Sequence, residues 1–327
     1  MIVTRTPVRI PLGGGGTDLP SYYTRHGGFL ISAAIDKYIY ITVNKRFEKS
    51  IRVSYSQTEI VDSVEEIKHP LVRESLKFLN IDSGIEITSI ADIPSNTGLG
   101  TSSSFTVGLI NALHTYKHEK VNAKELAEEA CHIEIGLLKE PIGKQDQYLA
   151  AFGGVICLDI DRLGNVDVKP VRLSEDALDQ LESNTLLFYT GIRRSASEVL
   201  CSQNQGASLN QEQVIRALHQ IKKIGLEIKK SFEKEDLERF GNLLDQHWQT
   251  KKTLSSKISK EKIDLWYDLA KKNGVLGGKL MGAGGGGFFM LFCNNGKNAL
   301  RKIMEQEGLK EMRFRIDFEG SKVLVNI

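Results

Sequence analysis

The sequence predicts an α+β protein with two domains, and three observations support this prediction. The chain has 327 residues, which suits two domains better than one. Short alternating strand patterns and amphipathic helical patterns follow one another without an internal repeat. A loop-like region around 160–180, which contains Gly164-Asn165, separates two such halves. We therefore expect one domain over 1–170 and a second over 171–327.

The first half of the chain predicts short strands joined by turns, with helices between them. The alternating segments 39–45 and 51–55 are expected to pair with each other. The last helix has an N-cap at Asn122 with Glu125 three residues on, and it stops before Pro141. Strands are expected at 6–12, 39–45, 51–55, 85–88 and 155–160. Helices are expected at 70–79, 103–117 and 122–139.

The second half predicts a strand, a long helical region, a glycine-rich turn and a closing set of strands. The helical region, 209–256, is heavily charged, and we expect no chemistry from it. Its pairs Lys229-Lys230 and Lys251-Lys252 are expected on solvated faces. Strands are expected at 185–189, 288–293 and 322–327, and a further helix near 297–307.

Composition excludes several classes of protein. The formal net charge of +2 gives no reason to expect nucleic acid or an anionic membrane as partner. The chain shows neither a charged-then-apolar leader nor an apolar run of the roughly 18–20 residues that span a bilayer, so we expect a cytoplasmic protein. Four widely separated cysteines without a C-x-x-C pair predict reduced thiols rather than disulfides or a zinc site. They are Cys131, Cys157, Cys201 and Cys293.

Residues 92–107, DIPSNTGLGTSSSFTV, form the most informative stretch of the chain. A strand pattern precedes Gly98-Leu99-Gly100, and four hydroxyl residues, Thr101 to Ser104, open the helical pattern that follows. This order directs backbone N–H groups and the positive end of a helix dipole toward one point, which favours a phosphate. A solvated Gly/Ser loop with a Ser N-cap is the alternative interpretation.

Two other glycine patterns match known phosphate-binding consensus sequences, but their sequence context does not fit these motifs. Gly282-x-Gly284-x-x-Gly287 fits the dinucleotide fingerprint, but a strand pattern follows it where that fingerprint needs a helix. Gly277-Gly278-Lys279 resembles the end of a P-loop, but Leu280 replaces the required Ser or Thr. Neither pattern predicts a nucleotide site.

Two carboxylates are candidates for chemistry. Glu134 lies on the inward face of its predicted helix, with apolar residues three, four and seven positions before it and four after it. Because an unpaired buried carboxylate costs several kcal/mol, it needs an Arg, a Lys or a metal. Asp146 follows a Pro/Gly-punctuated turn and could accept or orient the proton of a hydroxyl substrate. A structural ion pair for Glu134 and an N-cap role for Asp146 are the alternatives.

The N-terminal motif, RTPVRIPLGGGGTD, combines a strand with four glycines. Gly13 to Gly16 permit a ligand to approach the backbone closely. Thr17 and Asp18 are typical groups for holding sugar hydroxyls. Arg9 could neutralise a phosphate or lower the pKa of a carboxyl group beside it.

Together these motifs resemble the GHMP small-molecule kinases. GGGGTD is similar to their first motif, PSNTGLGTSSS to their phosphate loop, and KLMGAGGGGFFMLF to their third, glycine-rich motif. Thr101 replaces the first Ser of the family loop and keeps the hydroxyl, and Ser104 stands where small apolar residues are also common. The fold implied is an N-terminal domain like ribosomal protein S5 domain 2 and a ferredoxin-like C-terminal domain, with the site between them.

The resemblance assigns roles by position. It implies that Asp146 is the catalytic Asp and that Arg9 is the basic residue beside it. Mg²⁺, arriving with ATP, is implied to bind Ser102 and Glu134. The residues implied to wrap the ATP phosphates are Gly98, Leu99, Gly100, Thr101, Ser102, Ser103 and Ser104, with Gly284 and Gly285 closing the site. The residues expected at the acceptor are Gly14, Gly15, Gly16, Thr17, Asp18, Gly191, Arg193 and Arg194.

Within the family, the chain resembles most the sugar kinases that phosphorylate the C1 hydroxyl of D-glycero-α-D-manno-heptose 7-phosphate. The motifs GGGGTD, GKQDQY and YTGIRR carry this likeness, and a fucokinase is the near alternative. A 7-phosphate needs a second anion site, for which Arg193 and Arg194 are the candidates, with Lys279 and Arg25 behind them. An inert sugar- or nucleotide-sensing protein is a further alternative, although Ser102, Glu134 and Asp146 are all present. The oligomeric state is left open.

Overall fold

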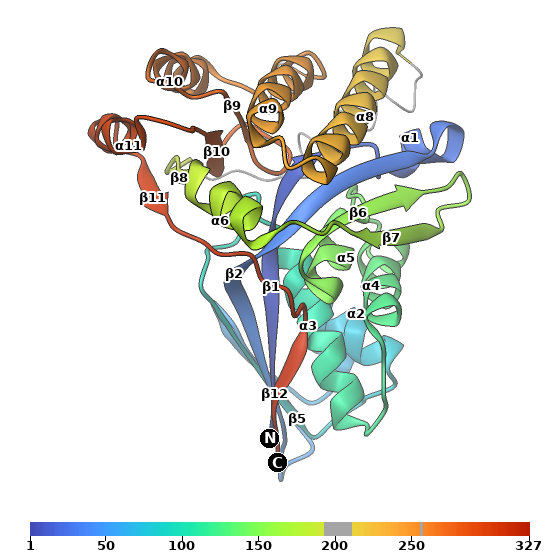
Figure 1. The fold of residues 1–327 in the computed structure, drawn as a ribbon. Coiled ribbons are helices and arrows are strands. Elements are labelled where there is room, and N and C mark those ends of the chain that lie inside the picture. The colour runs from blue at the N-terminus through green and yellow to red at the C-terminus, as the bar shows by residue number, and fades with distance from the viewer. Residues whose placement is uncertain (193–210, 256–257) are drawn as a thin grey trace.

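The structure is a computed structural model that describes residues 1–192, 211–255 and 258–327. Figure 1 shows two layered units, one carrying most of the helices from the first half of the chain and the other carrying α8 to α11. In the order of the chain, the helices α1 to α5 are α1 (Pro20–His26), α2 (Pro70–Phe78), α3 (Thr101–Tyr116), α4 (Ala123–Cys131) and α5 (Gln145–Phe152). Short 3₁₀ and π-helical turns lie at Val64–Glu66 and His132–Leu137.

An eight-stranded sheet organises the first unit. Its strands are β1 (Ile2–Gly13), β2 (Gly28–Lys45), β3 (Ile51–Ser54), β4 (Thr58–Val61), β5 (Ile85–Ala91), β6 (Val155–Ile160), β7 (Val166–Pro170) and β12 (Lys322–Asn326). The order along the main path is β12-β1-β2-β5-β3-β4, and β6 pairs with both β2 and β7. Helices α2 to α5 lie along this sheet in Figure 1, and α3 packs directly on β1 and β2.

The expected pairing of segments 39–45 and 51–55 is wrong. Strand β5 lies between them, antiparallel to β2 and parallel to β3. The alternation of apolar residues in both segments marks a strand with one buried face, but it carries no information on which strand becomes the neighbour. The expected helix over 122–139 begins as predicted, because Asn122 and Glu125 form a complete capping box, but it ends as a π-helical turn.

The second unit is built on a four-stranded antiparallel sheet. Its strands are β8 (Thr185–Tyr189), β9 (Gly277–Leu280), β10 (Phe288–Phe292) and β11 (Lys310–Met312). They run in the order β11-β8-β10-β9. The accompanying helices are α6 (Glu175–Asn184), α8 (Glu212–Glu233), α9 (Leu237–Lys252), α10 (Glu261–Lys272) and α11 (Lys297–Gln306). Helices separate β8 from β9 and β10 from β11, which is the β-α-β-β-α-β sequence of a ferredoxin-like domain, as expected.

The last strand returns to the first unit. β12 pairs antiparallel with β1 from Ile2 opposite Asn326 to Arg5 opposite Lys322, so both termini lie side by side in Figure 1. The division of the chain at 170/171 stays a prediction, but its final strand belongs to the first sheet. No helix within the described ranges is long and apolar enough to cross a membrane.

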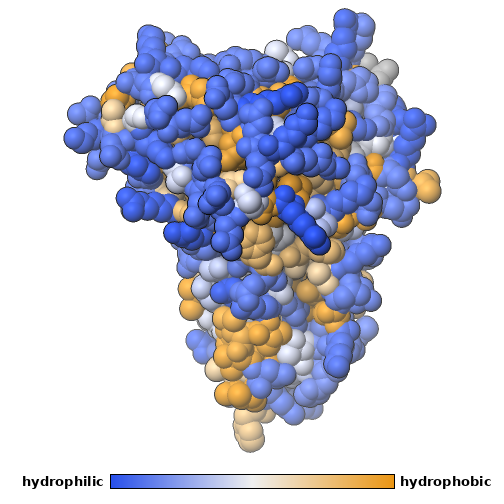
Figure 2. All heavy atoms as spheres, viewed as in Figure 1, coloured by the Kyte–Doolittle hydropathy of each residue, from blue (hydrophilic) through white to orange (hydrophobic). Residues whose placement is uncertain are grey.

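The surface differs between the two units. On the face drawn in Figure 2, hydrophilic residues dominate over α8 to α11, whereas apolar residues gather in the lower part of the molecule around β12. Val323 and Leu324 of that strand are 36% and 45% exposed. The polar surface of the upper unit matches the charged helical pattern predicted for its sequence.

Candidate active site

The glycine loop predicted to bind phosphate is a turn that leads into α3. Gly98 and Gly100 both adopt positive φ, at 82° and 78°, and α3 begins at Thr101. The backbone N–H of Arg9 donates to the carbonyl of Leu99 at 3.0 Å, which fixes the loop to β1. Because a helix begins there, its first N–H groups are free of intrahelical partners, which suits an anion.

This loop borders a cavity of about 460 Å³. Gly98 and Gly100 line it, as do the next three residues, Thr101, Ser102 and Ser103. Leu99 and Ser104 do not: Leu99 is fully buried in the core, and the Ser104 hydroxyl lies 2.8 Å from the carbonyl oxygen of Pro7. The side chains of these two residues therefore hold the loop in place rather than face a ligand.

The third glycine-rich motif packs against the loop backbone to backbone. A Cβ on Gly282 would lie 2.8 Å from the Cα of Gly98, and one on Gly287 would lie 2.2 Å from the carbonyl oxygen of Thr97. The N–H of Phe288 donates to that same carbonyl at 3.2 Å. Glycine is therefore required here for close packing between the two units.

The motif contributes different residues to the cavity from those expected. Gly282 and Ala283 line the cavity, whereas Gly284 and Gly285 do not. The N–H of Gly285 donates to the carbonyl of Ile258 at 2.6 Å, so it is occupied within the protein. β10 follows the motif directly, which confirms that its dinucleotide-like string lacks the required helix.

Arg9 and Asp146 form a bidentate ion pair at the edge of the cavity. The Nε of Arg9 lies 2.7 Å from Oδ1 of Asp146, and its Nη2 lies 2.9 Å from Oδ2. The Nη1 donates to the carbonyl of Gly98 at 2.7 Å. Asp146 lies in the first turn of α5 and is not its N-cap, which is Lys144. One guanidinium thus holds the candidate catalytic carboxylate against the glycine loop.

Glu134 lies on the π-helical turn and is buried, with 1% of its surface exposed. Its carboxylate accepts hydrogen bonds from Nε2 of Gln147 at 2.6 Å and from the Ser102 hydroxyl at 3.4 Å. Burial raises the pKa of this carboxyl group to about 7. Within the described part of the chain no Lys or Arg pairs with it, so the alternative of a structural ion pair is not observed.

Asp18 joins the first motif to the beginning of α5, which carries Asp146. Its carboxylate accepts hydrogen bonds from the N–H groups of Gly16 and Gln145, both at 3.1 Å. Burial raises the pKa of Asp18 above its ordinary value. A Cβ on Gly143 would lie 1.9 Å from Oδ2 of Asp18, so only glycine fits there. Asp18 and Asp146 therefore face the same cavity from adjacent segments.

The rest of the first motif divides between ligand-facing and structural positions. Gly15 and Gly16 line the cavity, and Gly14 does not. The Thr17 hydroxyl is fully buried and lies 2.8 Å from the carbonyl oxygens of both Gly14 and Phe29. Thr17 therefore closes the turn, and its hydroxyl is not available to a sugar.

The residues that the sequence predicts for a second anion site do not lie together in the structure. Arg193 and Arg194 lie outside the described residues. Gly191 and Arg25 are exposed and do not line the cavity, whereas Lys279 is buried and does.

The lining residues that the sequence analysis did not predict include two basic side chains from the second unit. His247 and Lys251 both come from α9. Lys251 is only 8% exposed, so its prediction as part of a solvated face is wrong. The four-residue spacing of His247 and Lys251 puts them on one helix face, but this spacing alone does not distinguish a solvated face from one that lines a cavity.

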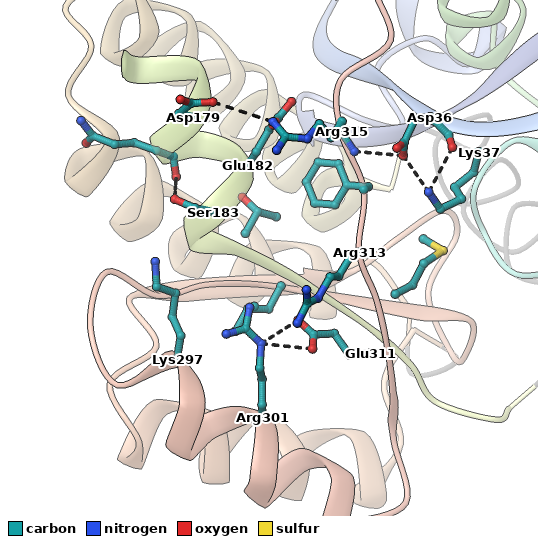
Figure 3. A pocket seen from close by; sticks show the side chains of 15 residues that line it. Asp36, Lys37, Asp179, Glu182, Ser183, Lys297, Arg301, Glu311, Arg313 and Arg315 are labelled. Carbon is teal, nitrogen blue, oxygen red and sulfur yellow. Dashed lines mark hydrogen bonds and ion pairs between the residues drawn. The ribbon is translucent and has the colours of Figure 1, made fainter. Parts of the chain in front are cut away.

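A larger cavity, of about 830 Å³, lies elsewhere and shares no lining residue with the first. Figure 3 shows that several of its charged side chains form pairs. Arg315 pairs with Glu182, and Arg301 pairs with Glu311. Lys297 and Arg313 also line this cavity and form no ion pair within the described part of the chain.

Comparisons with known proteins identify the family of this chain. The GHMP kinases N terminal domain matches residues 64–154, and the GHMP kinases C terminal domain matches residues 228–308. The D-glycero-alpha-D-manno-heptose 7-phosphate kinase of Campylobacter jejuni is 30% identical over 98% of both chains. The chain therefore belongs to the GHMP kinase family. Its assignment to ATP-dependent kinases with this two-domain fold, made from the sequence, is confirmed.

Two further matches come from the genus Bacteroides. The L-fucokinase/L-fucose-1-P guanylyltransferase of Bacteroides fragilis is 28% identical over 92% of this chain and 36% of that protein. The crystal structure of a D-glycero-D-manno-heptose 1-phosphate kinase from Bacteroides thetaiotaomicron covers both chains completely with a TM-score of 0.83 at 24% identity. At that identity the second match supports the fold.

Proposed function

We propose that the protein transfers the γ-phosphoryl group of ATP to the C1 hydroxyl of D-glycero-α-D-manno-heptose 7-phosphate. The observation that carries this proposal is the Arg9–Asp146 ion pair, which joins the glycine loop to the acceptor side of one cavity. The choice of sugar is supported by the full-length similarity to the Campylobacter jejuni kinase of that name.

The donor side of the proposed site is the beginning of α3. The backbone from Gly98 to Ser103 would bind the ATP phosphates, with the positive end of the helix dipole behind it. Catalysis of phosphoryl transfer consists mainly of positioning and charge stabilisation, which a rigid loop fixed to β1 can supply.

The oxygen atoms of Ser102 and Glu134 fit a Mg²⁺ ion that accompanies ATP. Both residues line the cavity, and their side chains are 3.4 Å apart. Mg²⁺ prefers oxygen ligands and is usually bound through one or two protein groups together with substrate phosphates and water. When bound, the ion would neutralise negative charge that builds up on the phosphates. A cation beside Glu134 would also favour its ionised form, which burial alone opposes.

The acceptor side consists of Asp18, Gly15, Gly16 and Asp146. Asp18 would bind sugar hydroxyls, and the glycines would let the sugar approach the backbone. Asp146 would orient the C1 hydroxyl and take its proton while the C1 oxygen bonds to the γ-phosphorus and the bond to the ADP oxygen breaks. Arg9 holds both carboxylate oxygens of Asp146, so it would fix the direction of that proton transfer.

A substrate panel tests this proposal. ATP consumption would be measured with D-glycero-D-manno-heptose 7-phosphate, unphosphorylated heptose, fucose, galactose and mannose. We expect the highest kcat/KM with heptose 7-phosphate. A preference for fucose would replace the proposal with a fucokinase. Binding of both ATP and sugar without turnover would replace it with a sensing protein.

The proposal also locates the reaction in the cytoplasm. ATP is the proposed donor, and the described cysteines Cys131, Cys157 and Cys293 are free thiols. Cys201 lies outside the described residues.

A further inference from the structure

A cluster of basic side chains from the second unit faces the active-site cavity. His247 and Lys251 come from α9, and Lys279 comes from β9. All three line the cavity together with Arg9 and Asp146. They are deeply buried, with 1%, 8% and 1% of their surfaces exposed. We call His247, Lys251 and Lys279 the basic wall.

The three side chains of the basic wall differ in their hydrogen-bond partners. Lys279 donates to the carbonyl of Leu12 at 3.2 Å, and it forms no ion pair within the described part of the chain. Both ring nitrogens of His247 are buried and have no hydrogen-bond partner among the described residues. Lys251 donates to the carbonyl of Gly282 at 2.5 Å.

These side chains are costly to the folded protein as they stand. Burial lowers the pKa of Lys279 well below its ordinary value, and Lys251 and Arg9 lower it further by charge repulsion. Burial likewise lowers the pKa of His247, with Lys279 and Lys251 adding repulsion. Buried polar groups without hydrogen-bond partners are unfavourable in a folded protein. An anion in the cavity would reduce this cost, because it would accept hydrogen bonds from Lys279 and His247 and favour their charged forms.

We propose that the basic wall binds the phosphate group that the acceptor sugar already carries. This inference rests on the proposed function, since it names the residues that recognise the 7-phosphate.

The position of Lys279 favours the acceptor phosphate over a phosphate of ATP. Lys279 contacts Leu12, which immediately precedes the glycines that lead to Asp18. The proposed ATP site already has its own anion cradle at the beginning of α3, on the other unit. A substrate held at C1 by Asp146 and at its phosphate by the basic wall would therefore contact both units.

The Lys279→Met variant tests this inference by steady-state kinetics. We expect the KM for heptose 7-phosphate to rise about 10- to 100-fold, as the loss of a charged hydrogen bond of about 1.5–3 kcal/mol predicts. The KM for ATP should stay within about twofold. With unphosphorylated heptose, the variant and the wild type should have the same KM.

Three further variants make the result specific. Lys279→Arg keeps the charge, so it should restore part of the affinity that Lys279→Met loses. His247→Asn removes a second member of the wall and should also raise the KM for heptose 7-phosphate, even if the Lys279 variants do not fold. Lys252→Met is the matched control, because Lys252 pairs with Asp264 and is not among the cavity residues. It should leave every KM unchanged.

Two kinetic results would overturn the inference. The first is an equal rise in the KM for ATP, which would assign the wall to the donor. The second is an equal rise with unphosphorylated heptose, which would assign it to the sugar ring or to the structure alone.

A binding experiment separates this inference from the proposed function. If the wild type shows no turnover of heptose 7-phosphate, the proposed reaction fails, but the wall can still be tested by calorimetry. Inorganic phosphate would be titrated into the protein saturated with a non-hydrolysable ATP analogue and Mg²⁺. Binding to the wild type that Lys279→Met and His247→Asn abolish supports an anion site. No binding to the wild type, or equal binding to the variants, overturns it.

Discussion

Arg9 contacts both the phosphate loop and the candidate proton acceptor of the proposed reaction. Its guanidinium binds both oxygens of Asp146 and the carbonyl of Gly98, and its own N–H holds Leu99. A planar fork with several donors can make these contacts at once, whereas a lysine cannot. The geometry of the proton acceptor and that of the phosphate loop are thus set by one side chain.

We predict different kinetic consequences for the two members of this pair. Asp146→Asn removes the proton acceptor and should lower kcat by about 10²- to 10⁴-fold. Arg9→Lys keeps a positive charge but loses the fork, so kcat should fall about 10-fold or more. A steady-state assay of ATP turnover measures kcat for both variants, and circular dichroism checks that the variants are folded. A kcat of Asp146→Asn equal to that of the wild type would show that Asp146 is not the proton acceptor.

Glu134→Gln tests the metal site at the same scale. The variant keeps a hydrogen-bonding side chain but loses the charge, so the Mg²⁺ concentration for half-maximal rate should rise about 10-fold or more. The control is Glu128→Gln on α4, whose side chain is 54% exposed. It should not change the Mg²⁺ dependence. Removal of Mg²⁺ by EDTA should abolish turnover in all three proteins, and an unchanged Mg²⁺ requirement in Glu134→Gln would argue against the proposed ligand.

At the scale of elements, the β9–β10 turn supports the phosphate loop. Its glycines allow the backbones of Gly282 and Gly98 to touch, where any side chain would intrude. The turn therefore couples the second unit to the beginning of α3 through packing rather than through side-chain hydrogen bonds.

Gly282→Ala measures this coupling, with Gly308→Ala as the matched control. Both glycines have positive φ, at 63° and 83°, but a Cβ on Gly308 would meet no atom of the described residues within 4 Å. Gly308→Ala should cost about 1–2 kcal/mol of unfolding free energy from backbone strain alone. Gly282→Ala should cost about 1–3 kcal/mol more and should also raise the KM for ATP. Urea unfolding measures the loss of unfolding free energy in both variants. Equal losses would mean that the loop moves aside for the added methyl group without a cost in stability.

The contact between α3 and α4 makes stability depend on pH. The ring nitrogens of His114 lie 2.7 Å from Glu129 and 2.8 Å from Glu119, and these carboxylates raise the pKa of His114 in the folded protein. Protonated His114 therefore stabilises the fold. The stabilisation is complete below the ordinary His pKa of about 6.5 and is lost as the pH rises through the higher folded value.

Thermal unfolding across this pH range measures the effect of His114. We predict that His114→Gln removes the part of the pH dependence that appears above about pH 6.5. His132→Gln is the control, because His132 is exposed on the neighbouring turn and makes no ion pair within the described residues. A His114→Gln curve parallel to that of the wild type would contradict this explanation.

Local sequence patterns predict the helices and strands themselves, but they do not predict which strands pair in the sheet. The capping box at Asn122 and the glycines at 98 and 100 determine where α4 and α3 begin, and each is visible in the sequence. The position of β5 between β2 and β3 depends on a crossover through α2, which no local pattern encodes.

At the scale of the whole molecule, the site forms where the two units meet. Asp146, Arg9, Asp18 and Glu134 could be predicted because short glycine-rich motifs or a buried charge identify them. His247 and Lys251 could not, since a basic residue on a charged helix has the same pattern whether water or another unit covers it. Only the packing of α9 beside the cavity distinguishes the two cases.

The central claim is phosphorylation of the C1 hydroxyl of heptose 7-phosphate, and NMR of the product tests it most directly. The purified protein would be incubated with ATP, Mg²⁺ and the sugar phosphate, and the product examined by ³¹P and ¹H NMR. We predict a 1,7-bisphosphate, with a new phosphorus signal coupled to the anomeric proton. A new phosphate coupled to any other position, or an unchanged sugar under conditions where both ligands bind, would contradict the account.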